Sequence, residues 1–213
     1  MIENTREIAG PWLLVLKIAR WLDLPGRLAG KAVAWLFLPM ILIIVFDAVG
    51  RKYLRKLDFV IANNWHGYLN SPVLQDAEWH LHAVIFLAAL GFAYSRNVHV
   101  RLDIFRHKFS DRGRLWLELL GGLIILFPFL AVLLNYGWEF FLSSWNADEG
   151  AGMSNGLDNR WAIKFFLVLG PTLLFFSTCS LLLRLFVRLF GPPIFVQATQ
   201  TDQISDASFS AYD

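Results

Sequence analysis

Four long runs of apolar residues, separated by clusters of charge, constrain this chain more than any other feature of its sequence. A helix needs roughly 20 residues to cross a hydrocarbon layer about 30 Å thick. The runs lie at about residues 32–50, 79–95, 115–140 and 162–187. Lys, Arg, Asp and Glu make up 17% of the chain, whereas soluble domains carry about 25%. The sequence therefore predicts an all-α integral membrane protein with four transmembrane helices.

Each run is expected to be helical, because a segment in lipid must satisfy its backbone hydrogen bonds internally. Pro39, Pro128 and Pro171 lie inside the runs. Membrane helices tolerate proline with a local kink, so these prolines do not contradict the prediction. We therefore expect residues 32–190 to form one four-helix membrane domain.

The N-terminal segment, residues 1–31, contains a shorter apolar stretch, GPWLLVLKIARWLDLPG. It is too short to cross a bilayer, and basic residues interrupt it at helical spacing. This pattern predicts an amphipathic helix in the membrane interface, with tryptophans at headgroup level and basic side chains on lipid phosphates. The candidate residues are Trp12, Lys17, Arg20 and Trp21. A cleaved signal peptide is the alternative, but Glu3 and Glu7 and the lack of an A-x-A site argue against it.

Basic residues are distributed unequally between the two predicted sides of the membrane. The side with both termini and the middle loop has thirteen Lys and Arg residues, and the opposite side has six. Because positively charged loops face the cytoplasm, both termini are predicted to be cytoplasmic, including a polar tail at residues 191–213. The cluster RKYLRK at residues 51–56 lies on the opposite side and runs against this rule. Its first residue, Arg51, is a further candidate for contact with the membrane interface.

Histidine and acidic residues cluster at both ends of the second run, in EWHLH and in HVRLD. The five histidines are divided three and two between the predicted sides, so one metal site cannot use both sets. We therefore predict no metal and no cofactor, and interpret both clusters as polar and aromatic caps at the interfaces. Their candidate residues are Glu78, Trp79, His80 and His82 on one side, and His99, Arg101 and Asp103 on the other.

The sequence carries no nucleophile elbow, no phosphate-binding glycine loop and no HExxH motif, so we predict that it is not an enzyme. A membrane enzyme built on Glu78, His80 and His82 is the alternative, and stoichiometric metal in the purified protein would identify it. Apolar residues interleave the basic segment at residues 96–114. That pattern favours contact with anionic lipid headgroups over contact with nucleic acid.

Few polar residues lie inside the runs. Asp47 stands four residues before Arg51, a spacing that predicts a local ion pair rather than a substrate site. Small and hydroxyl residues suit close helix packing. They are Ala89, Ala93, Gly121, Gly122, Ser177, Thr178 and Ser180. Four helices without a central charged group predict a scaffold rather than a self-sufficient transporter. A homo-oligomeric channel or a lipid-organising protein is the alternative.

Three stretches of the sequence resemble the small membrane subunit, DctQ-type, of tripartite ATP-independent periplasmic (TRAP) transporters. They are FDAVGRKY, SPVLQDAEWHLHAVIFLAALGFAYSRNVHVRLDIF and GLDNRWAIK. The resemblance spans roughly residues 32–187. The chain departs from the family pattern at two points. Ala151 replaces the serine that commonly stands two residues after the Glu, and the proline often seen soon after the Lys comes late, at Pro171.

The resemblance implies a multi-pass protein of the bacterial inner membrane with two protein partners. One is a large multi-spanning permease subunit that carries the substrate and the coupling sodium ions, and the other is a periplasmic substrate-binding protein. The small subunit would enlarge the fixed scaffold of the permease. The long loop between the first two runs resembles that of subunits serving 2-oxo acids and other organic acids. Asp148 and Glu149 then become candidates for contact with the binding protein.

Overall fold

The structure, a computed structural model, describes residues 2–65, 72–96, 109–150 and 157–199. Within these residues every regular element is a helix, and four helical segments are long and apolar enough to cross a membrane. They are Gly10–Lys52, Pro72–Ser95, Asp111–Asn146 and Trp161–Phe190. The prediction of an all-α chain with four membrane-length helices is therefore confirmed. The candidates His99, Arg101 and Asp103 and most of the predicted tail lie outside the described residues.

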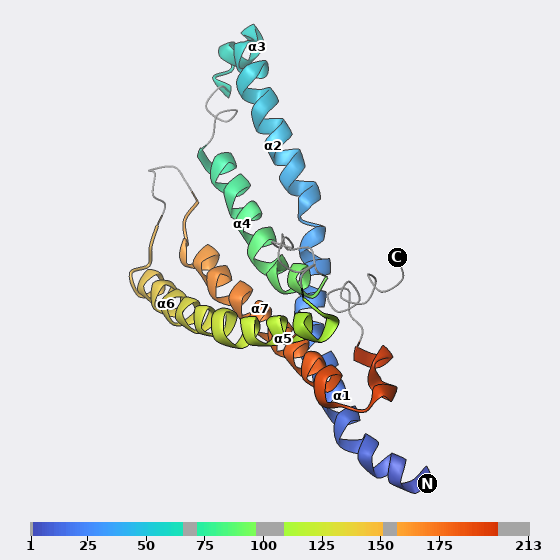
Figure 1. The fold of residues 1–213 in the computed structure, drawn as a ribbon. Helices are drawn as coiled ribbons and strands as arrows, with labels where there is room; N and C mark the ends of the chain where they lie inside the picture. Colours follow the sequence, from blue (N-terminus) through green and yellow to red (C-terminus); the bar gives the residue numbers. More distant parts are fainter. Residues whose placement is uncertain (1, 66–71, 97–108, 151–156, 200–213) are drawn as a thin grey trace.

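The first membrane-length segment is a rod made of α1 (Ile2–Ala34) and α2 (Phe37–Lys52), drawn in blue and cyan in Figure 1. At Trp35 and Leu36 the backbone amides donate to carbonyls three residues back, at 3.3 and 3.0 Å. Pro39 explains this break, because it has no N–H for the Trp35 carbonyl and its ring crowds that oxygen. The rod therefore bends without being interrupted by a loop.

One stripe of α1 is buried against α4 (Pro72–Ser95) and α7 (Trp161–Phe190). Its members recur every three or four residues, which is the spacing of one helix face. They are Leu16, Ala19, Asp23, Gly26, Gly30 and Val33. The same stripe continues on both sides of residue 31, and the predicted division of the chain at that residue stays a prediction. The position of this segment in the membrane interface stays a prediction.

The remaining described elements lie after α2, in the third membrane-length segment and after α7. After α2 come a 3₁₀ turn, η1 (Leu54–Lys56), and a short helix, α3 (Asp58–Ala62). The third membrane-length segment consists of α5 (Asp111–Gly121), a π-helical turn η4 (Gly122–Leu126) and α6 (Phe127–Asn146). The Phe127 amide donates to the carbonyl of Gly122, five residues back. This wide turn lies directly before Pro128, which cannot donate an ordinary helical bond. Two 3₁₀ turns, η5 (Pro193–Phe195) and η6 (Gln197–Thr199), follow α7.

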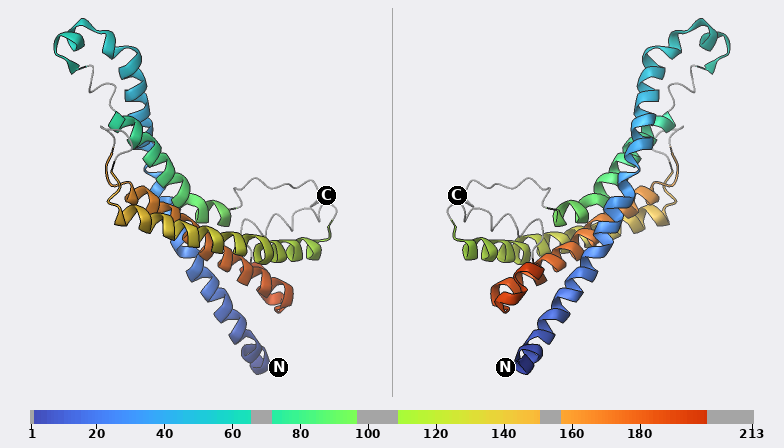
Figure 2. Two further views of the ribbon diagram at one scale, coloured as in Figure 1. Left: turned by 90° about the vertical axis from the view of Figure 1, so that its left-hand side faces the viewer. Right: turned by 90° about the vertical axis from the view of Figure 1, so that its right-hand side faces the viewer.

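α7 is the central helix of the bundle, and the two side views of Figure 2 show α1, α4 and the α5–α6 segment beside it, whereas α3 stands apart. It packs against α1, α4, α5 and α6. Within the most apolar 18-residue stretch of α7, half of the residues are buried, compared with 11–17% in the other three membrane-length segments. Leu181, Leu182 and Leu185 of α7 form the largest apolar cluster of the described residues together with Leu115 and Leu119 of α5.

Glycines allow α4 and α7 to cross with their backbones in contact. A Cβ atom placed on Gly91 of α4 would lie 2.7 Å from the carbonyl oxygen of Leu173 in α7. In return, a Cβ on Gly170 of α7 would lie 2.6 Å from the carbonyl oxygen of Leu87 in α4. Small residues of this kind bring membrane helices close enough for van der Waals contact along the backbone. The two glycines therefore let the backbones of α4 and α7 touch where the helices cross.

The small residues predicted for close packing behave differently from one another. Gly122 lies against Leu182 of α7, whereas a Cβ on Gly121 would meet open space. Ser180 donates a hydrogen bond of 2.6 Å to the carbonyl of Ala19 in α1, which confirms a predicted contact between helices. Thr178 instead bonds to Leu174 of its own helix. Only part of the predicted set therefore lies at helix contacts.

Candidate functional site

Charged side chains gather at the two ends of the bundle. We call the end at Lys52, Pro72, Asn146 and Trp161 the loop end, and the end at Ser95, Asp111 and Phe190 the terminal end. Between them, each membrane-length segment has a stretch without Asp, Glu, Lys or Arg. These stretches are residues 32–46, 83–95, 119–138 and 165–183. The candidate sites are therefore two separate polar clusters with an apolar layer between them.

At the loop end, Asp47 of α2 forms the predicted ion pair with Arg51, one turn further along the same helix. Asp47 is fully buried, while the Arg51 side chain is 45% exposed. The structure adds a partner that the sequence did not reveal, because the carboxyl group of Glu78 in α4 lies against that of Asp47. Two acidic side chains from different helices thus meet at one place, where Asp47 is buried and Glu78 is half-buried.

The predicted cap around Trp79 and His80 is organised by Asp76, a residue that sequence analysis did not single out. The Trp79 indole donates to Asp76 Oδ1 at 3.0 Å, and His80 Nδ1 lies 2.6 Å from the Asp76 carbonyl oxygen. Asp76 Oδ2 also accepts a hydrogen bond of 2.9 Å from the amide of Leu157. Asp76 therefore ties α4 to the segment that enters α7.

Glu149 is engaged inside the chain. Its carboxylate accepts a hydrogen bond of 2.6 Å from Ser144 and pairs with Lys164 of α7. The Lys164 ammonium lies 4.0 Å from the centre of the Phe140 ring. These hydrogen bonds, first that from Lys164 and then that from Ser144, lower the pKa of Glu149. Of the two predicted contacts for a binding protein, Glu149 therefore fixes the loop between α6 and α7, while Asp148 is exposed.

We expect acid to release this loop. A carboxylate whose pKa is lowered by folding contributes stability above its ordinary pKa, and that contribution is lost as the pH falls through the lowered value. Below about pH 4 the Glu149–Lys164 pair should open. Limited proteolysis between α6 and α7 should then become faster, and Glu149→Gln should show the faster cleavage already at neutral pH. Glu139→Gln, an exposed change on α6, is the matched control and should leave cleavage unchanged.

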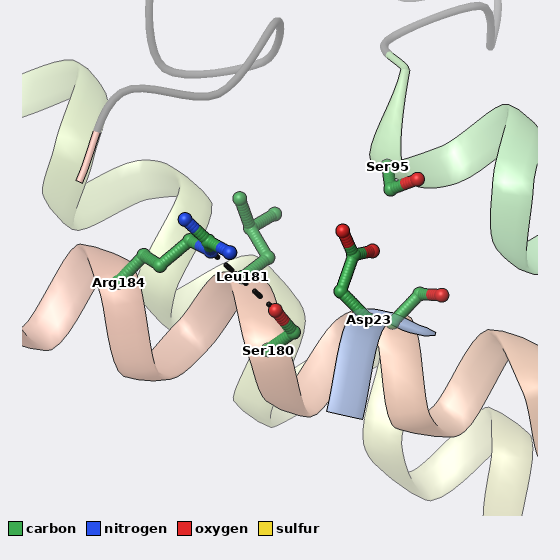
Figure 3. Close-up of a pocket in the computed structure, with 6 residues that line it drawn as sticks. Asp23, Ser95, Ser180, Leu181 and Arg184 are labelled. Atoms are coloured by element: carbon green, nitrogen blue, oxygen red, sulfur yellow. Dashed lines mark hydrogen bonds between the residues drawn. The ribbon is translucent and has the colours of Figure 1, made fainter. Parts of the chain in front are cut away.

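At the terminal end, a small cleft lies where α1, α4 and α7 meet, and Figure 3 shows it in close-up. The Asp23 carboxylate points into this space, and the Arg184 guanidinium reaches back to Ser180, with 3.5 Å between Nε and Oγ. Asp23 also lies 4.0 Å from Arg27. Ser95, Ser177 and Leu181 complete the lining. The cleft encloses about 10 Å³, which is the space of about one water molecule.

The residues predicted to contact lipid lie mostly on exposed faces. Lys17, Arg20 and Trp21 are exposed on α1, whereas the Trp12 ring lies 6.2 Å from that of Phe186 in α7. At the loop end Arg51, Trp79 and His82 are also exposed. This exposure is compatible with lipid contact, which stays a prediction. In the part of the chain that the structure describes, no three His, Cys, Asp or Glu side chains come together as a metal site.

Comparison with known proteins gives one match. A family model described as "Tripartite ATP-independent periplasmic transporters, DctQ component" matches residues 40–188. The matched region begins in α2, after the break at Trp35 and Leu36, and ends in the last turn of α7. No curated protein and no solved structure matches the chain. The match therefore covers the loop-end cluster and most of the helices that build the α7-centred bundle.

Proposed function

The chain belongs to the DctQ family of tripartite ATP-independent periplasmic transporters, and from this membership we propose that it is a scaffold that stabilises the large transport subunit. It is an inner-membrane transporter component and not an enzyme. Family membership associates it with a large permease subunit and a substrate-binding protein. We propose that the assembled system takes up an organic acid, such as a 2-oxo acid, driven by sodium.

The uncharged middle of the bundle is the observation that carries the scaffold role. A transport path needs polar or ionisable groups along its length, because an ion or a carboxylate in apolar surroundings must be paired. Here each membrane-length segment has an uncharged stretch between its ends, and the α4–α7 crossing closes the centre with backbone contact at Gly91 and Gly170. This arrangement suits a fixed support for a path in another subunit.

The large apolar surface that remains exposed supports the same role. In three of the four membrane-length segments, only 11–17% of the residues in the most apolar 18-residue stretch are buried. Several large apolar side chains are at least half exposed, among them Ile41, Phe46, Ile124 and Phe129. In a membrane such a surface faces lipid or another helix. The long α1–α2 rod and the α5–α6 segment thus offer two extended faces to a large hydrophobic partner.

Reconstitution should separate the role of this chain from that of its partner. Vesicles that contain the large subunit, this chain and the binding protein should accumulate the organic acid when a sodium gradient is applied. Without this chain we expect uptake to fall at least tenfold and the melting temperature of the large subunit to fall, because its membrane support is missing. Radiolabelled substrate uptake and thermal unfolding measure the two effects.

Two controls make the result specific. Adding the chain back to the vesicles should restore uptake, whereas an unrelated four-helix membrane protein should not. Full sodium-driven uptake by the large subunit and the binding protein alone, with unchanged thermal stability, would contradict the scaffold role. A closed ring of this chain that forms in the absence of the large subunit would instead support the homo-oligomeric channel.

A further inference from the structure

The pair of carboxyl groups at the loop end has an unusual electrostatic balance. Asp47 of α2 is fully buried, and Glu78 of α4 lies against it. Asp47 and Arg51 of α2 are the charged groups that act on Glu78 among the described residues. The other titratable group nearby on α4 is His82, one turn further along and exposed. If both carboxyl groups were ionised, one guanidinium would face two negative charges, and the cluster would carry a net charge of about −1 in the membrane domain.

The two carboxyl groups also lack hydrogen-bond donors. Asp47 Oδ1 and Glu78 Oε1 are buried and receive no hydrogen bond. The contact between Arg51 and Asp47 is an ion pair that does not supply a hydrogen bond in good geometry to either Asp47 oxygen. A buried carboxylate oxygen without a donor is costly, because nothing replaces the water it has lost. The missing component is therefore a donor located between the two carboxyl groups.

A metal ion does not meet this requirement well. The described residues offer no third His, Cys, Asp or Glu beside the pair, and the Arg51 guanidinium already lies on the Asp47 carboxylate. A hard cation needs six or more oxygen ligands, and two carboxylates beside a guanidinium cannot provide them. A proton needs only the two carboxyl oxygens, because a carboxylic acid donates its O–H to a neighbouring carboxylate.

We propose that Asp47 and Glu78 form a proton-binding site, in which a protonated Glu78 donates a hydrogen bond to the Asp47 carboxylate and thereby joins α4 to α2. The proton comes from water and binds one Glu78 oxygen, and the net charge of the cluster becomes zero. The Asp47 carboxylate then has a hydrogen-bond donor, Glu78 from α4, in addition to its ion pair with Arg51 of α2. This hydrogen bond would link the two helices close to where α2 leaves the bundle toward α3.

Loss of the proton from Glu78 would place two negative charges against each other, so it should weaken the contact between α2 and α4. A proton held more tightly in the folded chain than in the unfolded chain stabilises the fold at low pH, and this stability is lost as the pH rises. The melting temperature of the full chain in detergent should therefore fall by about 3 °C or more as the pH is raised and the site loses its proton.

Infrared spectroscopy of the full chain in detergent tests the site directly. At neutral pH the wild type should show the carbonyl-stretch band of a protonated carboxylic acid, and this band should shift in deuterated water. Glu78→Gln should remove the band. Its amide can still donate to Asp47, so the melting temperature at neutral pH should stay close to that of the wild type and no longer fall toward pH 9. Asp47→Asn should also remove the band, because Glu78 would then ionise and pair with Arg51.

The matched control is Glu139→Gln, which changes an exposed glutamate of α6 and should leave the band and the pH dependence unchanged. Absence of the band from the wild type at neutral pH would overturn the proposal, as would a band that survives both Glu78→Gln and Asp47→Asn. If Glu78→Gln does not fold, an infrared titration of the wild type and Asp47→Asn decides the question. A band that is present only in the wild type and fades toward high pH supports the site.

Discussion

Replacing Gly91 with alanine should lower the melting temperature of the purified chain by about 3 to 10 °C. The added Cβ would lie 2.7 Å from the Leu173 carbonyl oxygen and 2.9 Å from its carbon, and both atoms belong to the backbone of α7, which cannot rotate away. Overpacking of this kind costs about 1 to 3 kcal/mol, and 1 kcal/mol corresponds to about 2 to 4 °C in a chain of this size. Thermal unfolding in detergent, followed by tryptophan fluorescence, measures the change.

The same helices supply matched controls. Gly170→Ala places a Cβ 2.6 Å from the Leu87 carbonyl oxygen and should cost as much as Gly91→Ala. Gly121→Ala meets no atom within 4 Å, so the melting temperature should stay the same or rise slightly, since alanine is the better helix former. A Gly91→Ala variant as stable as Gly121→Ala would mean that α4 and α7 do not touch at this point.

Asp23→Ala should destabilise the terminal end of the bundle by about 2 kcal/mol or more, a fall of about 5 °C in melting temperature. Arg184 is 8% exposed, and Asp23 is the negative group that acts on it, while Arg20 and Arg27 act with the opposite sign. Removing Asp23 leaves the Arg184 guanidinium buried near two other cations. Its hydrogen bond to Ser180 is long at 3.5 Å and compensates little.

Three further variants separate this effect from a general loss of surface charge. Arg27→Ala removes a half-exposed partner of Asp23 and should change the melting temperature by less than about 2 °C. Glu139→Ala removes an exposed carboxylate of α6 and should also have a small effect. The double variant Asp23→Ala/Arg184→Met should recover part of the loss, because no buried charge then lacks a partner. No recovery would show that Asp23 acts without Arg184.

The features that the sequence predicted are those that depend on local pattern. Long apolar runs predict membrane-length helices because every residue of a run adds to its total hydrophobicity. The Asp47–Arg51 ion pair follows from helical spacing alone. The resemblance of the loops and run ends to the DctQ family gave the transporter assignment, and the family match on residues 40–188 confirms it. Contacts with lipid and with the binding protein remain predictions.

The features that escaped prediction depend on contacts between helices. The stripe that packs α1 into the bundle contains Asp23, Gly26 and Gly30, so its residues are not apolar enough to stand out by hydropathy. The sequence predicts an interface cap at Glu78. It does not reveal the contact between Glu78 and Asp47, because that contact joins two helices that are separate in sequence. Asp76 was overlooked because its partner, the amide of Leu157, belongs to a loop far along the chain. Sequence spacing within one helix carries no signal for any of these contacts.

The central place of α7 has a consequence for how the protein is made. The ribosome delivers α7 last of the four membrane-length segments, after the other three have entered the membrane. α1 and α4 can meet early, since they pack on each other, but the main partner of α6 is α7. The third segment must therefore remain in the bilayer with its glycine and aromatic contacts to α7 unmade until α7 has been synthesised. A message cut short before Trp161 would yield a lasting form of this half-assembled intermediate, with the surface for α7 open to lipid and to membrane proteases.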